Sequence, residues 1–79
     1  MASQNESLAL TREQKEEIEN LFNFNSKWFT MAKDDPDAAV GFSSACNTII
    51  AMLKILGVSD IETISAEVDG TSYEKISLS

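Results

Sequence analysis

The chain has 79 residues, a net charge of −7 from 6 basic and 13 acidic side chains, and one cysteine but no histidine. This composition excludes an intramolecular disulfide, histidine-based catalysis, and a metal site built from histidine and cysteine ligands. It also argues against direct binding of nucleic acid or of an anionic membrane, because both need basic surface on the protein.

A chain of this length predicts a single domain, residues 1–79, with a modest buried core. Residues 1–10 lack the pattern of a signal peptide and are expected to form a flexible arm. The most apolar stretch, Ile49–Leu56, is interrupted by Lys54 and is far shorter than the roughly 20 residues that span a bilayer. With its lone cysteine in a largely apolar stretch, the chain is expected to be cytoplasmic. Its negative charge and its short apolar stretch predict that it does not bind membranes.

A first helix is expected to begin at Thr11, which can form a capping box with Gln14. Lys33 is expected in the last turn of this helix, where a cation is favoured. Phe24 and Met31, seven residues apart, form a second apolar line beside the main apolar face. That main face has helical spacing and consists of Ile18, Leu21, Phe22, Trp28, Phe29 and Ala32.

The Asp-Asp-Pro-Asp sequence at 34–37 separates the first helix from a second one. The residue before a proline avoids helical geometry, and Asp35 can cap the helix that follows. The second helix is expected over Pro36–Leu56, with Gly57 as its left-handed terminator. Because the link is short, the two helices are expected to form an antiparallel hairpin over residues 11–57.

Residues 58–79 are expected to form a β-hairpin, because Asp69-Gly70 is a strong two-residue turn between segments rich in strand formers. A short helix is the alternative, since Ser59 and Glu62 can form another capping box. In the hairpin, one face carries Ile64, Ala66, Val68 and Tyr73, and the other carries Ile76 and Leu78. The expected fold class is therefore mainly α, of the α+β type: a two-helix hairpin followed by a short C-terminal β-hairpin.

The second predicted helix is apolar around most of its circumference, and one neighbouring helix cannot cover such a surface. Small domains without disulfides or metals gain stability by self-association. We therefore expect a homodimer or higher oligomer in which helical hairpins join into a bundle. Gly41 and Ala45 would allow close approach of another helix, or else serve plain core packing. The residues expected at the oligomer interface are Phe24, Met31, Phe42, Ile49, Ile50, Leu53 and Leu56.

A set of polar and aromatic side chains is a candidate ligand site. In an antiparallel hairpin closing near residue 35, residues whose numbers sum to about 70 lie opposite one another. Lys27 suits a phosphate, Trp28 suits stacking on a base, and two asparagines suit base edges, as in a nucleotide-like ligand. The alternative is that these groups form a solvated strip or satisfy one another. The set consists of Asn23, Lys27, Trp28, Ser43 and Asn47.

No constellation in the sequence predicts catalysis, and no cofactor or metal is expected. The carboxylates of Asp34, Asp35 and Asp37 are explained by capping and turn formation. We expect a non-catalytic, acidic, homo-oligomeric protein that occupies or inhibits a partner protein. Small phage accessory inhibitors have this character, which is an analogy of class alone. The alternatives are a sponge-like module that sequesters a nucleotide-like ligand between protomers and an acidic nucleic-acid mimic.

Overall fold

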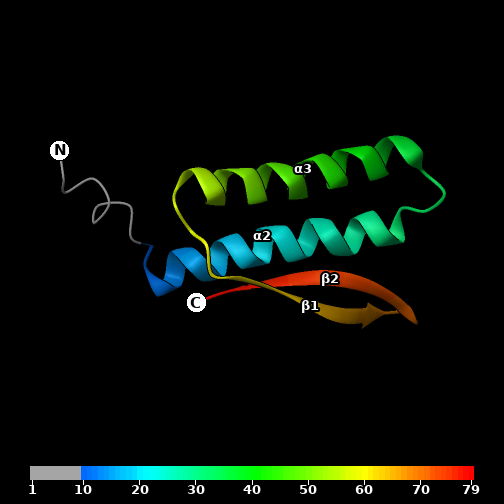
Figure 1. Ribbon diagram of the computed structural model, residues 1–79. Coiled ribbons are helices and arrows are strands. Elements are labelled where there is room, and N and C mark those ends of the chain that lie inside the picture. The colour runs from blue at the N-terminus through cyan, green and yellow to red at the C-terminus, as the bar shows by residue number, and fades with distance from the viewer. Residues whose placement is uncertain (1–9) are drawn as a thin grey trace.

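The computed structural model describes residues 10–79, so the arm predicted for residues 1–10 lies almost wholly outside the described residues. The elements form three layers, with α2 between α3 and the β-hairpin (Figure 1). Their order confirms the predicted two-helix hairpin followed by a C-terminal β-hairpin. In chain order, the elements are α2 (Arg12–Met31), α3 (Pro36–Ile55), β1 (Ile61–Val68) and β2 (Thr71–Leu78).

Both helices begin at the predicted capping residues. The Thr11 hydroxyl accepts a hydrogen bond from the Gln14 amide at 3.1 Å, and the Gln14 side chain accepts one from the Thr11 amide at 2.9 Å. Asp35 caps α3 by accepting a 3.2 Å hydrogen bond from the Ala38 amide. The end of α2 differs from the prediction, because the helix stops two residues before Lys33, which lies in the turn.

The end of α3 is a glycine-terminated Schellman motif. The helix ends at Ile55, one residue before the predicted end, and Gly57 follows with a φ of 83°. The Val58 amide then donates a 2.9 Å hydrogen bond back to the Leu53 carbonyl. This left-handed glycine turns the chain away from α3 and toward the hairpin, as the sequence predicts.

β1 and β2 pair antiparallel along their whole length. Asp69 and Gly70 join them with φ angles of 50° and 77°, the two positive values of a type I′ turn. The β-hairpin prediction is therefore confirmed, and the alternative of a short helix capped by Ser59 is wrong. Ile76 and Leu78 lie on the buried face of the hairpin. The other face carries Ile64, Ala66, Val68 and Tyr73, as expected.

Two polar side chains of α2 bind the outer edge of β2. In this register the amides of Ile76 and Leu78 are not used for pairing with β1. Asn23 Oδ1 accepts a hydrogen bond from the Ile76 amide at 2.9 Å, and Glu19 Oε2 accepts one from the Leu78 amide at 2.6 Å. A strand edge that would otherwise remain open to another chain is thus covered by a helix of the same chain.

The core is small and lies where α2 meets its two neighbouring layers. The apolar side chains buried within residues 10–79 are Phe22, Leu53, Ile76 and Leu78. Partly buried apolar side chains pack around them, namely Leu10, Ile18, Cys46, Ile49, Ile50, Val58 and Ile61. Large apolar side chains that keep 40–80% of their surface exposed are Leu21, Phe24, Trp28, Phe29, Met31, Val40, Met52, Ile55 and Ile64. Much of the apolar circumference of α3 is therefore uncovered, as is half of the predicted apolar face of α2.

Within residues 10–79, α3 is the one helix long and apolar enough to cross a membrane, by length and composition alone. The helix extends well beyond the apolar stretch Ile49–Leu56 that stands out in the sequence. The helix has 20 residues, and an 18-residue window within it has a mean hydropathy of 1.4. Length therefore gives no reason to exclude a bilayer as the surface that covers α3.

The packing predicts a large difference between two apolar positions of α3. Replacing Leu53, which is 1% exposed, with alanine should lower the free energy of unfolding by about 2–5 kcal/mol, because a cavity opens in the core. Replacing Val40, which is exposed on the same helix, with alanine should leave it nearly unchanged. Urea unfolding at one fixed protein concentration measures both values. Equal losses in the two variants would contradict this assignment of the core.

Candidate functional site

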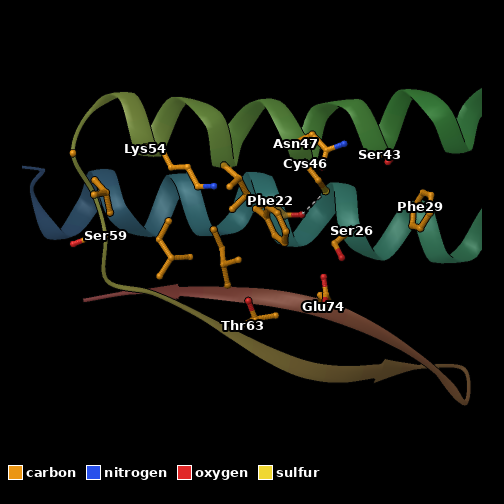
Figure 2. A pocket seen from close by; sticks show the side chains of 15 residues that line it. Phe22, Ser26, Phe29, Ser43, Cys46, Asn47, Lys54, Ser59, Thr63 and Glu74 are labelled. Atoms are coloured by element: carbon orange, nitrogen blue, oxygen red, sulfur yellow. Dashed lines mark hydrogen bonds between the residues drawn. The ribbon is translucent and has the colours of Figure 1, made fainter.

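A groove of about 760 Å³ lies between α3 and the β-hairpin, with α2 as its floor (Figure 2). We refer to it as the groove. Apolar side chains from all three layers line it, including Phe22, Phe29, Ile50, Ile61 and Ile76. Polar side chains stand along its walls, including Ser43, Asn47, Lys54, Thr63 and Glu74. Apolar lining with a few polar groups is the usual composition of a binding site.

Helical and strand periodicity explain how these polar groups reach the groove. Ser43, Asn47 and Lys54 are separated by steps of four and seven, so they form one strip along α3. On the hairpin, Thr63 and Glu74 belong to the face that carries the buried strand residues, because side chains of one face alternate along each strand. The two strips stand on opposite sides of the floor, one on α3 and one on the hairpin (Figure 2).

The two charged side chains that line the groove have opposite signs and lie at different positions along it. Lys54 lies on α3 toward the end of the groove marked by Ser59 (Figure 2). Glu74 lies on β2 below Ser26, further along the floor (Figure 2). A ligand that lies along the groove therefore meets a cation near one end and an anion further along.

Cys46 lines the groove as a neutral thiol. Its Sγ donates a hydrogen bond to the carbonyl oxygen of Phe22 at 3.7 Å. Burial of the thiol, and second the negative charge of Glu74, raise the pKa of Cys46 above its ordinary value. The protonated form predominates at neutral pH, so this cysteine contributes apolar surface and not a nucleophile.

The lining of the groove offers contacts that can hold another molecule. Across residues 10–79, no three histidine, cysteine, aspartate or glutamate side chains gather as metal ligands would. The negative charge of Glu74 raises the pKa of the Cys46 thiol and so disfavours the thiolate. What remains is an apolar floor with hydroxyl, amide and charged groups on its walls, which can orient a bound molecule.

The predicted ligand residues do not converge on one site. Ser43 and Asn47 line the groove, whereas Asn23 uses its side-chain oxygen to bind the Ile76 amide of β2. Lys27 and Trp28 are not part of the groove lining. The reason is geometric: a shared height in a helical hairpin places residues at one level but says nothing about which side of each helix they occupy.

Trp28 packs against Phe24 and does not line the groove, where a nucleotide base was expected to stack on it. The two rings are 6.2 Å apart between centroids and are tilted by 59°. Most of the groove lining is absent from the predicted set, including Phe29 on the floor and the two charged residues Lys54 and Glu74. Spacing could have found Lys54, which shares the strip of Ser43 and Asn47, but Glu74 reaches the groove only through the packing of β2 on α2.

The predicted interface residues are distributed over several environments. Phe24 and Met31 are exposed on α2, whereas Ile50 lines the groove. Leu53 is buried against α2 in the core of its own chain, so it is not on a surface that a second copy could contact. The remaining predicted interface residues are partly buried: Phe42, Ile49 and Leu56.

No family model matches the chain, and neither a curated protein nor a solved structure is significantly similar to it. A fold of two helices and a hairpin does not by itself imply a function. The function therefore has to be inferred from the residues of this chain and their geometry.

The surroundings of Cys46 predict a thiol that reacts slowly at neutral pH. The midpoint of the pH dependence of its alkylation by iodoacetamide should lie above that of the same cysteine in the denatured chain. Glu74→Gln should lower this midpoint, because a nearby negative charge is removed, but burial should keep it above the denatured value. Alkylation rates followed by mass spectrometry give the midpoints of the folded wild type, the denatured chain and the folded Glu74→Gln variant. A midpoint in the folded chain at or below the denatured value would contradict the assignment.

Proposed function

We propose that this chain is a non-catalytic binding protein that assembles with itself and holds an apolar helical segment of a partner protein in the groove. The proposal is carried by the apolar surface left uncovered: within residues 10–79, nine large apolar side chains are exposed, against four that are buried. Monomeric soluble proteins rarely expose contiguous apolar patches above a few hundred Å², and larger patches mark interaction sites.

The length of the groove supports a helix as its occupant. From Ser43 to Lys54, α3 advances over eleven residues, which is about 17 Å or three helical turns. Phe22, Phe29 and Ile50 offer apolar contacts along this length, which suit the side chains of an amphipathic helix spaced three, four and seven residues apart.

The charges of the groove give such a helix a direction. Its C-terminal carbonyl groups would be favoured near Lys54, and its N-terminal amides nearer Glu74, because a helix carries partial charges of those signs at its ends. The net charge of −7 favours a basic partner surface around the bound helix. A partner held in this way cannot use the same helix for its other contacts, which is how occupation would inhibit it.

Selection from a displayed library of helical peptides tests the proposal without knowledge of the natural partner. The selected peptides should carry an amphipathic apolar pattern with basic flanks. Phe29→Glu should weaken their binding at least roughly tenfold, since burial of an unpaired charge costs more than the approximately 1.4 kcal/mol of a tenfold change. Fluorescence anisotropy measures the affinities.

The matched control is Val40→Glu, which adds the same charge at an exposed apolar position of α3 that does not line the groove. It should leave peptide binding unchanged. Failure of the library to yield a helical binder, or equal binding to the wild type and Phe29→Glu, would show that the groove does not hold helices.

A second candidate function is sequestration of a small molecule. The observation that favours it is the volume of the groove, about 760 Å³, which falls within the roughly 300–1,000 Å³ of small-molecule sites. Ser43 and Asn47, two of the predicted ligand residues, would supply a hydroxyl and an amide. Lys54 would take the anion-binding role that the sequence assigned to Lys27, because it is Lys54 that lines the groove.

A small ligand should be seen in native mass spectrometry of the purified protein as added mass that is lost on denaturation. With the recovered compound added back, the melting temperature should rise, and Lys54→Ala should reduce this rise while Lys27→Ala leaves it unchanged. A reduction caused by Lys27→Ala but not by Lys54→Ala would place the ligand outside the groove.

A further inference from the structure

Six of the nine exposed large apolar side chains lie in two stripes, one on each helix. Both stripes advance by alternating steps of three and four residues, the spacing of a coiled-coil contact line. Neither stripe contains a charged residue, in a chain with 19 charged side chains. On α2 the stripe is Leu21, Phe24, Trp28 and Met31. On α3 it is Ala38, Gly41, Ala45, Thr48, Met52 and Ile55. We refer to the two stripes together as the seam.

The seam lies on the side of the two helices opposite the groove. Phe24, Trp28 and Met31 each stand two residues beyond a residue of α2 that lines the groove. Two residues correspond to about 200° around an α-helix, which is the opposite side. Ala45 and Met52 are related in the same way to groove residues of α3. The molecule thus has two separate uncovered surfaces.

Large residues of α2 lie level with small residues of α3 along the seam. The helices are antiparallel, with the end of α2 level with the start of α3 (Figure 1). Residues at about the same height therefore have numbers that sum to about 68, as the hydrogen bond from Cys46 to the carbonyl oxygen of Phe22 shows. Within about one residue of this rule, the level pairs of the seam are Met31 with Ala38, Trp28 with Gly41, Phe24 with Ala45, and Leu21 with Thr48.

Among residues 10–79, neither backbone geometry nor a close contact requires the glycine at the middle of this pattern. A glycine inside a helix is less stable than an alanine would be. Gly41 does not need a positive φ, and a Cβ atom built on it would meet nothing within 4 Å. The space beside Gly41 is therefore free for a side chain of another molecule.

We propose that a second copy of this chain covers the seam, in a dimer whose two-fold axis runs parallel to the helices. This rotation preserves height and places α2 of each copy on α3 of the other. Trp28 of one copy then packs over Gly41 of the other copy, and Phe24 packs over Ala45. An axis perpendicular to the helices would instead place small residues of α3 against each other and crowd the aromatic rings of α2. The inference rests on the self-assembly in the proposed function and specifies its surface and symmetry.

The seam is large enough for a stable dimer. Its six large side chains expose on the order of 600 Å² per copy, at roughly 200 Å² for each side chain and about half of that exposed. A biological interface needs about 500 Å² from each partner. At the far end, Met52 and Ile55 lie level with Glu17 and Gln14, whose aliphatic stems can cover apolar surface while their polar heads stay in water.

Sedimentation equilibrium and native mass spectrometry in detergent-free buffer test the dimer. The wild type should have twice the 8.7 kDa mass of one chain. Gly41→Leu should raise the dissociation constant at least roughly tenfold, because the added side chain occupies the space of Trp28 in both halves of the interface. The change favours helix formation, so the monomer stays folded. Trp28→Ala combined with Gly41→Leu should return the dissociation constant toward the wild-type value. In this double variant the large side chain stands on α3 and the small one on α2, so the two positions again fit each other.

Asn47→Leu is the matched control, because it adds a leucine on the groove side of the same helix. Its dissociation constant should equal that of the wild type. A monomeric wild type, or a Gly41→Leu variant that dimerises normally, overturns the inference. A loss of dimer in Asn47→Leu alone would show that the copies meet through the groove, which overturns the inference while leaving self-assembly in place. The peptide-binding test with Phe29→Glu decides the partner role of the groove independently.

Disulfide trapping tests the direction of the axis. In a Cys46→Ser background, an equal mixture of Trp28→Cys and Gly41→Cys single variants should form a covalent heterodimer under mild oxidation, whereas Ala45→Cys alone should not form a covalent dimer. A covalent dimer of Ala45→Cys in place of the heterodimer would show that α3 packs on α3 across the interface.

Vesicle flotation tests a bilayer as the alternative occupant of the seam. When the wild type is mixed with phosphatidylcholine vesicles and centrifuged in a density gradient, the protein should not float with the vesicles. Flotation that Gly41→Leu abolishes would show that a bilayer covers the seam and would overturn the inference.

Discussion

The position of α2 between two layers determines where the core forms and which surfaces of the helices stay uncovered. α3 packs on one side of α2 and β2 packs on another, so the core forms only where these contacts meet. Asn23 and Glu19 strengthen the second contact by accepting hydrogen bonds from the β2 edge. Within residues 10–79 no further element packs on α3, and an apolar helix with one neighbour keeps most of its surface uncovered.

This arrangement leaves two uncovered surfaces of different chemistry. The groove has polar walls, with Asn47 on α3 and Glu74 on β2, and such mixed surfaces suit partners that bind and dissociate. The seam has no charged group, and its large and small residues complement each other at the same height. Interfaces between permanent partners are more apolar than exchangeable ones. The proposed roles are therefore self-assembly for the seam and partner binding for the groove. Both surfaces could be occupied at once, because they lie on opposite sides of the helices.

Short-range chemistry made most of the fold predictable. The capping box at Thr11, the break before Pro36, the left-handed Gly57 and the Asp69-Gly70 turn each act over a few residues, and each forms as expected. The strand faces followed from the position of that turn, because side chains alternate strictly along a strand. The predicted ends of the helices were less accurate. α2 ends before Lys33, which the sequence had placed in the last turn of this helix.

The sequence by itself determined the elements, their order and the heights at which the two helices meet, because hydrogen-bonding and turn geometry are local. Only the tertiary structure decided which side of each helix is covered. Periodicity showed apolar residues around most of α3 and gave no reason to place Leu53 in the core while Met52 stays exposed. That choice depends on where the β-hairpin packs. The position of the hairpin also decides that Lys54 and Glu74 line the groove, whereas Lys27 and Trp28 do not. Contacts between residues far apart in the chain compete for the same helix surface, and local patterns contain no information about which of them prevails.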